Sequence, residues 1–151
     1  MAVRIDQIVP PDRQVATGPD YLTPRLGALA STLARGDGTD AFRAEMERAG
    51  TPLVEPLDDG QAIVTFLWRG ARRNVRLLGG PSNHHERLER LGNSDVWFKS
   101  FLVPDCLRQS YRRLAPDVPE LPFNARARRV AILATAESDP LNRHPCPWRT
   151  R

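Results

Sequence analysis

The 151-residue chain has no long apolar run and only two cysteines. Because no stretch approaches the roughly 18 apolar residues that cross a bilayer, we expect no membrane span and no membrane partner. The opening sequence MAVRIDQIVPPDRQ lacks the apolar core of a secretory signal, which predicts a cytoplasmic protein. Cys106 and Cys146 lie far apart without C-x-x-C spacing, so we expect two free thiols.

Lysine is almost missing, since all of the 22 basic residues except Lys99 are arginine. This skew fits the coding bias of a GC-rich genome as well as selection for a basic surface. The arginines are scattered among acidic residues and form no nucleic-acid-binding motif, so we expect no nucleic-acid partner. The functional alternative is an anionic ligand, because guanidinium groups present a planar donor fork to carboxylate, phosphate or phenolate oxygens.

A serine-hydrolase motif is also missing. An α/β-hydrolase needs a G-x-S-x-G turn, followed along the chain by an acid and a histidine. Ser82 in GPSNH and Ser94 in GNSDV each have the first glycine and lack the second. We therefore predict no catalytic residue on this chain.

The histidines do not predict a metal site either. His84 and His85 are adjacent, and neighbouring side chains of an extended segment point to opposite sides. His144 has Cys146 two residues later, without the ligand spacing of zinc sites. For the paired histidines, one alternative is an imidazole bonded within the loop beside one that faces solvent. The other is a ligand-facing histidine at a domain cleft.

Two helices are predicted near the beginning of the chain. Thr23 suits an N-cap and Pro24 the first helical position, and apolar residues then repeat at helical spacing. A second short helix is predicted from Asp40 to Ala49, where glycine and proline follow. The two form a helical hairpin in residues 23–58, after a loosely structured lead-in of residues 1–22.

Beyond Gly60 the apolar period changes from helical to two, which predicts β-strands. The strands are expected at 62–69, 74–78, 95–102 and 107–113. Short strands separated by turn signals are typical of an antiparallel sandwich, which we predict for residues 59–142. One helical turn is expected at 86–91. Extended chain is expected beyond 115, with a strand or a helix at 129–136.

Two tryptophans lie on the predicted strands. Trp68 and Trp97 are expected to pack between the sheets, as tryptophan commonly does in sandwiches. If both were exposed on one face, they would instead form a stacking surface for a sugar or a catechol ring. Asp95 is expected to fix a turn rather than to act as an acid.

Six short motifs follow one another along residues 60–142. They are VTFLWRG (64–70), LLGG (77–80), the pair His84 and His85, SDVW (94–97), SYR (110–112) and DPLN (139–142). Their order and spacing together resemble the N-terminal domain of enterochelin esterases. The resemblance implies an early-set immunoglobulin-like β-sandwich. It also implies a family of cytoplasmic enzymes that hydrolyse the ester backbone of ferric catecholate siderophores to release iron.

The resemblance also implies a division of labour. In the family the DPLN segment leads into an α/β-hydrolase domain, so residues 143–151 are expected to begin a linker to a catalytic domain that is absent here. That domain would act in cis or in trans, while this chain helps bind or position the siderophore. Iron is expected only within the bound siderophore, with no cofactor. Candidate contacts for the bulky anionic complex are His84, His85, Arg87, Arg69 and Trp97.

Two alternatives stay open at this point. A carbohydrate-binding immunoglobulin-like module would share the architecture and present Trp68 and Trp97 together on one sheet face. A purely structural docking module would instead present an exposed apolar patch to the catalytic domain.

Overall fold

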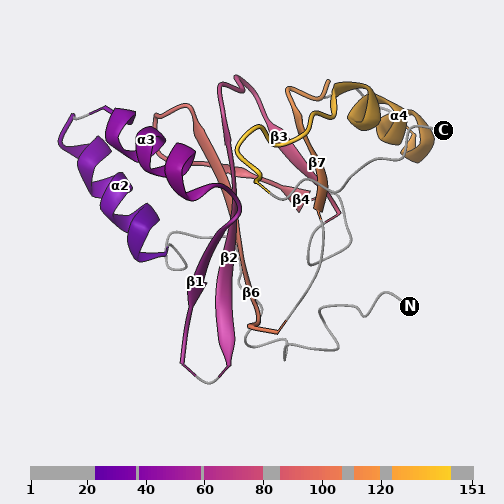
Figure 1. The fold of residues 1–151 in the computed structure, drawn as a ribbon. Coiled ribbons are helices and arrows are strands. Elements are labelled where there is room, and N and C mark those ends of the chain that lie inside the picture. Colours follow the sequence, from indigo (N-terminus) through magenta and orange to yellow (C-terminus); the bar gives the residue numbers. More distant parts are fainter. Residues whose placement is uncertain are drawn as a thin grey trace.

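The computed structural model describes residues 23–36, 38–58, 60–79, 86–106, 111–119 and 124–143. Its helices are α2 (Pro24–Ala34), α3 (Asp40–Ala49) and α4 (Ala125–Thr135). Its strands are β1 (Leu53–Pro56), β2 (Gln61–Arg69), β3 (Val75–Gly79), β4 (Glu86–Arg87), β5 (Glu89–Arg90), β6 (Val96–Pro104) and β7 (Tyr111–Pro116). Figure 1 shows their arrangement. No helix in this part of the chain is long and apolar enough to cross a membrane.

The strands form two antiparallel sheets. Sheet A has four strands in the order β1-β2-β6-β5, and sheet B has three in the order β4-β3-β7. A shared apolar core joins the two sheets. Its buried members are Phe66, Ala71, Val75, Leu77, Leu88, Trp97, Phe101, Val103 and Leu114. The mainly β, antiparallel prediction is therefore confirmed, while the finer immunoglobulin-like assignment stays a prediction.

The central strands obey the predicted alternation. Phe66 of β2 faces the core between the sheets, whereas its neighbour Leu67 belongs to a second cluster beneath the helices. β2 pairs with β1 on one side and with β6 on the other, so both faces are covered. In β6 the same alternation places Trp97 between the sheets and Phe98 beneath the helices.

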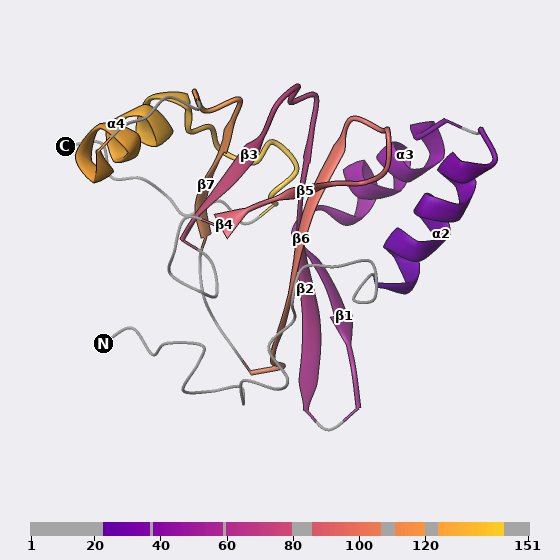
Figure 2. The same ribbon diagram turned by 180° about the vertical axis from the view of Figure 1, so that it is seen from behind.

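The helical hairpin packs on the outer face of sheet A (Figure 2). Thr23 caps α2 as predicted, because its Oγ1 accepts a hydrogen bond from the Leu26 N–H at 3.2 Å. The bounds of α3 are also as predicted. The cluster beneath the hairpin consists of Leu26, Leu29, Met46, Leu53, Leu67, Leu91, Val96 and Phe98.

The third helix, α4, covers the outer face of sheet B. Its N-cap is Asn124, whose Oδ1 accepts a hydrogen bond from the Ala127 N–H at 2.8 Å. Ile132 is the one buried side chain of α4, and it packs on Leu78, Ala115 and Val118. Mostly extended chain was expected beyond 115, with a strand or a helix at 129–136, and of these alternatives the helix forms and begins earlier. The helix forms because arginine and alanine are good helix formers and the apolar outer face of sheet B supports one side of it.

The helical turn predicted at 86–91 is wrong. Glu86 and Arg87 pair with β3 of sheet B, whereas Glu89 and Arg90 pair with β6 of sheet A. Leu88 lies between these pairs and is buried in the shared core. The segment therefore passes from one sheet to the other, and interstrand hydrogen bonds replace helical ones.

An ion pair also joins the two sheets. The Nζ of Lys99 on β6 lies 3.5 Å from Oε2 of Glu86 on β4, and the lysine side chain is only 12% exposed. Nζ also lies 5.8 Å from the centre of the Phe101 ring. The chain's single lysine thus lies between the sheets. Its ammonium group is more compact than the guanidinium of an arginine would be there.

β2, β3 and β6 differ from their predicted bounds by only one or two residues, and two other strands differ more. β1 was not predicted, because Pro52 precedes it and Pro56 is its last residue, but proline is compatible with its position at the edge of sheet A. β7 begins at Tyr111, and residues 107–110 of the predicted strand lie outside the described residues.

Candidate functional site

A pocket of about 390 Å³ lies between α3, the adjacent ends of β2 and β6, and the segment 139–141. This volume is within the range of pockets that bind small molecules. Its walls are largely apolar, with charged groups among them. The lining residues are Phe42, Arg43, Met46, Glu47, Leu67, Trp68, Arg69, Gly70, Asp95, Val96, Asp139, Pro140 and Leu141.

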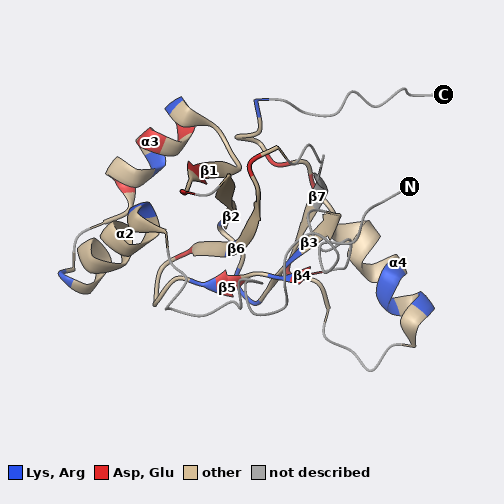
Figure 3. Cartoon of the chain, turned by 90° about the horizontal axis from the view of Figure 1, so that it is seen from below, with Lys and Arg blue, Asp and Glu red and all other residues tan. Residues whose placement is uncertain are grey.

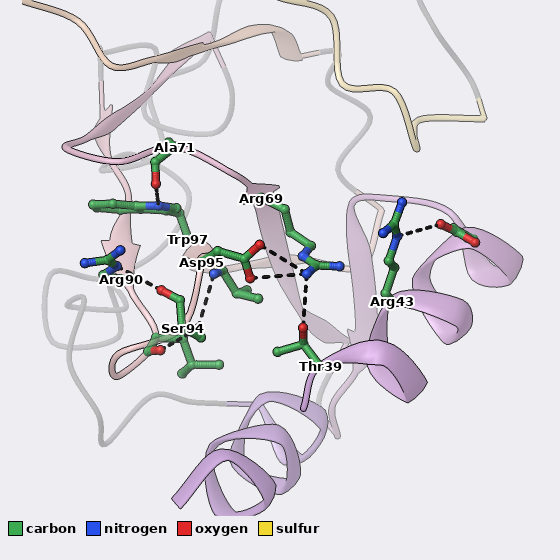
Figure 4. Close-up of polar contacts among 11 residues, drawn as sticks. Thr39, Arg43, Arg69, Ala71, Arg90, Ser94, Asp95 and Trp97 are labelled. Carbon is green, nitrogen blue, oxygen red and sulfur yellow. Dashed lines mark hydrogen bonds and ion pairs between the residues drawn. The ribbon is translucent and has the colours of Figure 1, made fainter. Parts of the chain in front are cut away.

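Arg69 is the polar centre of this pocket (Figure 4). Its Nη2 donates to Thr39 Oγ1 at 3.0 Å and to the two carboxylate oxygens of Asp95 at 3.2 and 3.1 Å. Its Nε is buried and has no hydrogen-bond partner among the described residues. The turn between the two helices and Asp95 before β6 thus hold the guanidinium through Nη2, while Nε keeps no partner among the described residues.

Asp95 has two structural roles in this site. Its backbone carbonyl accepts a hydrogen bond from the Gly70 N–H at 3.2 Å, which ties the end of β2 to the beginning of β6. Its carboxylate is the counterion of Arg69, with a closest contact of 3.1 Å. The ion pair is partly exposed, so its main effect is to orient the arginine rather than to stabilise the fold.

The charges around the pocket are nearly balanced. Arg43 pairs with Glu47 at 3.0 Å on the exposed surface of α3, as Arg69 pairs with Asp95. Asp139 adds a third carboxylate to the lining. The pocket therefore favours a small aromatic or weakly charged group over a large, highly anionic one.

The two tryptophans lie side by side on β2 and β6 but differ in exposure. Trp97 is only 6% exposed, and its Nε1 donates to the Ala71 carbonyl at 3.0 Å. The guanidinium of Arg90 lies over its ring, 5.5 Å from the centre. Trp68 is half-buried, packs against the same core and lines the pocket. The core interpretation of both residues is confirmed, and burial removes Trp97 from direct stacking on a ligand.

The sequence-predicted site residues are only partly brought together. Arg69 and Trp97 lie on adjacent strands but on opposite faces of sheet A, because Arg69 faces the helices and Trp97 the core. Arg87 is exposed on β4 of sheet B, across from Arg76 of β3. His84 and His85 lie outside the described residues.

Sequence reasoning missed the other walls of the pocket. Phe42 and Met46 carry no distinguishing signal, because their helical spacing is that of any packed amphipathic helix. The segment 139–141 had a usable signal, since it is part of the DPLN motif. Thr51 Oγ1 donates to Asp139 Oδ2 at 2.5 Å, and the Thr51 N–H donates to the Leu141 carbonyl at 3.0 Å. These bonds hold the segment at the rim of the pocket.

The described residues contain no group of three or more His, Cys, Asp or Glu side chains arranged to hold a metal ion. Cys106 is an exposed free thiol, whereas Cys146 lies outside the described part.

Comparison with known proteins places this geometry in a family. Residues 63–151 match the family described as enterochelin esterase, N-terminal. The iron(III) enterobactin esterase of Dickeya dadantii is 35% identical over 98 residues, covering 56% of this chain and 22% of that protein. The iron(III) enterobactin esterase of Yersinia enterocolitica is 31% identical over 143 residues, covering 79% and 39%. The chain thus spans well under half the length of these curated relatives.

Solved structures give a similar result. The enterobactin esterase of Shigella flexneri, crystallised in the presence of 2,3-di-hydroxy-N-benzoyl-glycine, has a TM-score of 0.53 and 24% identity over 70% of this chain and 31% of that one. The ferric enterobactin esterase of Salmonella typhimurium has a TM-score of 0.52 and 23% identity over 70% and 32%. At this identity the similarity concerns the fold alone.

Proposed function

The chain belongs to the enterochelin esterase N-terminal family, and from that premise we propose that it helps bind and position a ferric catecholate siderophore. In this proposal a catalytic domain, in cis or in trans, hydrolyses the siderophore ester and thereby allows iron release in the cytoplasm. This chain contributes binding contacts and no catalytic group.

The observation that carries the proposal is Arg69 in a largely apolar pocket that Phe42 and Met46 also line. A catechol ring needs an apolar surface for its faces and a donor for its oxygens, and these residues supply both. Thr39 and Asp95 already hold the guanidinium, so little side-chain freedom is lost when a ligand binds.

The size and charge of the pocket support one aryl arm as the group that enters it. A volume of about 390 Å³ suits a single dihydroxybenzoyl unit and is small for a complete tris-catecholate complex. The carboxylates of Glu47, Asp95 and Asp139 would also oppose entry of the whole anionic complex. The Shigella flexneri relative was crystallised in the presence of such a single-arm compound, 2,3-di-hydroxy-N-benzoyl-glycine.

A tryptophan-fluorescence titration with 2,3-dihydroxybenzoyl-glycine tests this proposal, since Trp68 lines the pocket. Absorption by the ligand is corrected with a free-tryptophan standard, and calorimetry repeats the measurement independently. We expect saturable quenching in the wild type and about tenfold weaker binding in Arg69→Met, because a charged hydrogen bond contributes roughly 1.5–3 kcal/mol.

The matched control is Arg48→Met, which removes an exposed arginine of α3 outside the pocket lining. It should bind as the wild type does. Equal affinity of Arg69→Met and Arg48→Met, or no saturable binding by either method, would contradict the proposal. Circular dichroism confirms that each variant is folded.

The balanced charges of the pocket favour a second candidate, a docking module that supports the catalytic domain without touching the siderophore. This candidate is tested by adding the chain in trans to a relative's catalytic domain that lacks its N-terminal domain. Equal recovery of ester hydrolysis by wild type and Arg69→Met would favour docking alone.

The glycan-binding alternative is not supported, because Trp97 is buried and offers no exposed ring face beside Trp68.

A further inference from the structure

The solvent face of α4 has the pattern of a docking helix. Arg126, Arg129, Val130 and Leu133 follow the spacing i, i+3, i+4 and i+7, which places them on one side of a helix. Val130 is 59% exposed and Leu133 is 52% exposed, while Ile132 packs on sheet B. We call these four outward residues the α4 stripe.

Strand β1 and the turn that follows it also expose apolar side chains, here with acidic residues nearby. Val54 is 58% exposed and Leu57 is 44% exposed. Asp58 is exposed in the turn, and the exposed Asp105 is held next to Gly60 of the same turn by the hydrogen bond from its N–H to the Gly60 carbonyl at 3.0 Å. The acidic end is therefore defined here as Val54, Leu57, Asp58 and Asp105.

These two surfaces contain all the exposed large apolar side chains of the described residues. One surface adds two arginines and the other two aspartates. Figures 1 and 2 place α4 and the β1–β2 turn at opposite ends of the molecule, and Figure 3 shows the basic residues along α4. The surfaces therefore cannot meet within one chain.

We propose that the α4 stripe of one copy binds the acidic end of a second copy. Each copy presents both surfaces, so the contact is head-to-tail and generates a ring if the rotation closes or an open chain if it does not. Burial of the four apolar side chains drives association, and the arginines and aspartates select the partner and its orientation. The proposal is independent of siderophore binding, because neither surface includes a residue of the pocket lining.

The contact is small and partly electrostatic, so it should be weak, fast and sensitive to salt. Sedimentation velocity over a wide range of protein concentrations measures it. We expect the weight-average mass to rise with concentration at low salt and to return to the monomer value at high salt. A reducing agent prevents disulfide formation through the exposed Cys106, which neighbours Asp105.

Charge reversal makes the test specific. Arg126→Glu with Arg129→Glu should abolish association, and so should Asp58→Arg with Asp105→Arg. A chain that carries all four substitutions should associate again, because its two surfaces are once more complementary. A mixture of the two half-reversed chains should form mixed assemblies, although each alone stays monomeric.

Arg128→Glu is the matched control, since Arg128 is exposed on the same helix but does not belong to the stripe. It should associate as the wild type does. A wild-type monomer at every concentration, or association that survives either half-reversal, would overturn the proposal. Protection of α4 from hydrogen exchange only after a relative's catalytic domain is added would assign the stripe to that domain and would also overturn it.

Discussion

The sandwich carries helices on both outer faces, and the two helical layers differ in how much they bury. The α2–α3 hairpin contributes Leu26, Leu29 and Met46 to a large cluster with sheet A, whereas α4 contributes only Ile132 to its cluster with sheet B. The deeper layer encloses a pocket against the sheet. The shallower layer leaves an apolar helix face exposed. Under the two proposals above, small-molecule binding belongs to the hairpin side and self-association uses α4.

The cause of this difference lies in the apolar pattern of each helix. In α2 the leucines fall on the face that meets the sheet, so they are removed from water. In α4 the apolar residues Val130, Ile132 and Leu133 spread around the helix, and a single sheet face cannot cover them all. An 11-residue helix of this kind is marginal alone, so its packing on sheet B decides whether it forms.

Cavity-forming substitutions should separate the two layers most strongly. Leu26→Ala should lower the free energy of unfolding by about 3 kcal/mol, because the side chain is fully buried beneath the hairpin. Ile132→Ala should cost less, about 1–2 kcal/mol, because α4 can detach locally while the sandwich remains folded. Urea unfolding followed by both tryptophan fluorescence and far-ultraviolet circular dichroism measures the two. Equal losses in a single transition for both variants would show that α4 is as integral as the hairpin.

The bond between the hairpin and the DPLN segment should have the next largest effect. Thr51→Val keeps the side-chain shape but removes the donor to the buried Asp139 carboxylate, at an expected cost of about 1.5–3 kcal/mol in unfolding free energy. The control is Thr32→Val on α2, where the hydroxyl bonds to an exposed carbonyl. A change of less than about 0.5 kcal/mol is expected there. Similar urea midpoints for the two variants would contradict a stabilising role for the bond.

On the sheet B side, Asp117 makes the polar contact that compares with the Thr51–Asp139 bond of the hairpin side. Its carboxylate accepts hydrogen bonds from the backbone N–H groups of Arg72 at 3.0 Å and Arg73 at 2.7 Å. Burial by itself raises the pKa of Asp117, but the backbone donors of Arg73, Arg72 and Asn74 outweigh it, so the pKa lies below its ordinary value of 3.8.

Because the pKa of Asp117 is lowered in the folded protein, its contribution to the free energy of unfolding depends on pH with a definite sign. A lowered native pKa stabilises the fold above the unfolded value of 3.8, and this stabilisation is lost as pH falls through the native pKa. Asp117→Asn should lower stability by about 0.5–1 kcal/mol near neutral pH, since the site is partly solvated. Asparagine tolerates the positive φ of 50° at this position. Chemical unfolding of both proteins at neutral and acidic pH should show the difference shrinking in acid, and a constant difference would contradict this assignment.

The smallest effect is expected at the exposed rim of the pocket. Arg43→Ala removes the surface pair with Glu47, which should cost only about 0.3–0.5 kcal/mol. The change should disappear at high salt, because exposed pairs are screened. Thermal unfolding with and without added salt measures it. A loss as large as that of Thr51→Val would mean that Arg43 has a structural role beyond its ion pair.

Local signals predicted the helical hairpin and the central strands well. Thr23 and Pro24 define a helix start through capping and a preset backbone angle, and both effects act within one turn. The alternation in β2 and β6 depends only on neighbouring residues. The segment 86–91 misled the prediction, because four residues that pair with two different sheets contain no period of either kind.

The candidate site was predictable only in part. Arg69 was identified from its place in the VTFLWRG motif, but its partners Thr39 and Asp95 come from separate turns that only the packing of the hairpin brings together. Trp97 was named both as a core residue and as a ligand contact. Its burial against Arg90 and the Ala71 carbonyl decides for the core.

The sequence by itself determined the helical hairpin, the alternating strands, the missing serine-hydrolase motif and the resemblance to one esterase family. The hairpin, the strands and the missing motif depend on residues that are close together along the chain, and the resemblance depends on the order of short motifs. Only the tertiary structure decided which arginine lines a pocket, which tryptophan is buried and which helix keeps an apolar face in water. The run from Val64 to Gly70 forms one side of the pocket, but α3 and the segment 139–141 complete it. Contacts between such distant segments depend on sheet register and layer packing, which no local period encodes.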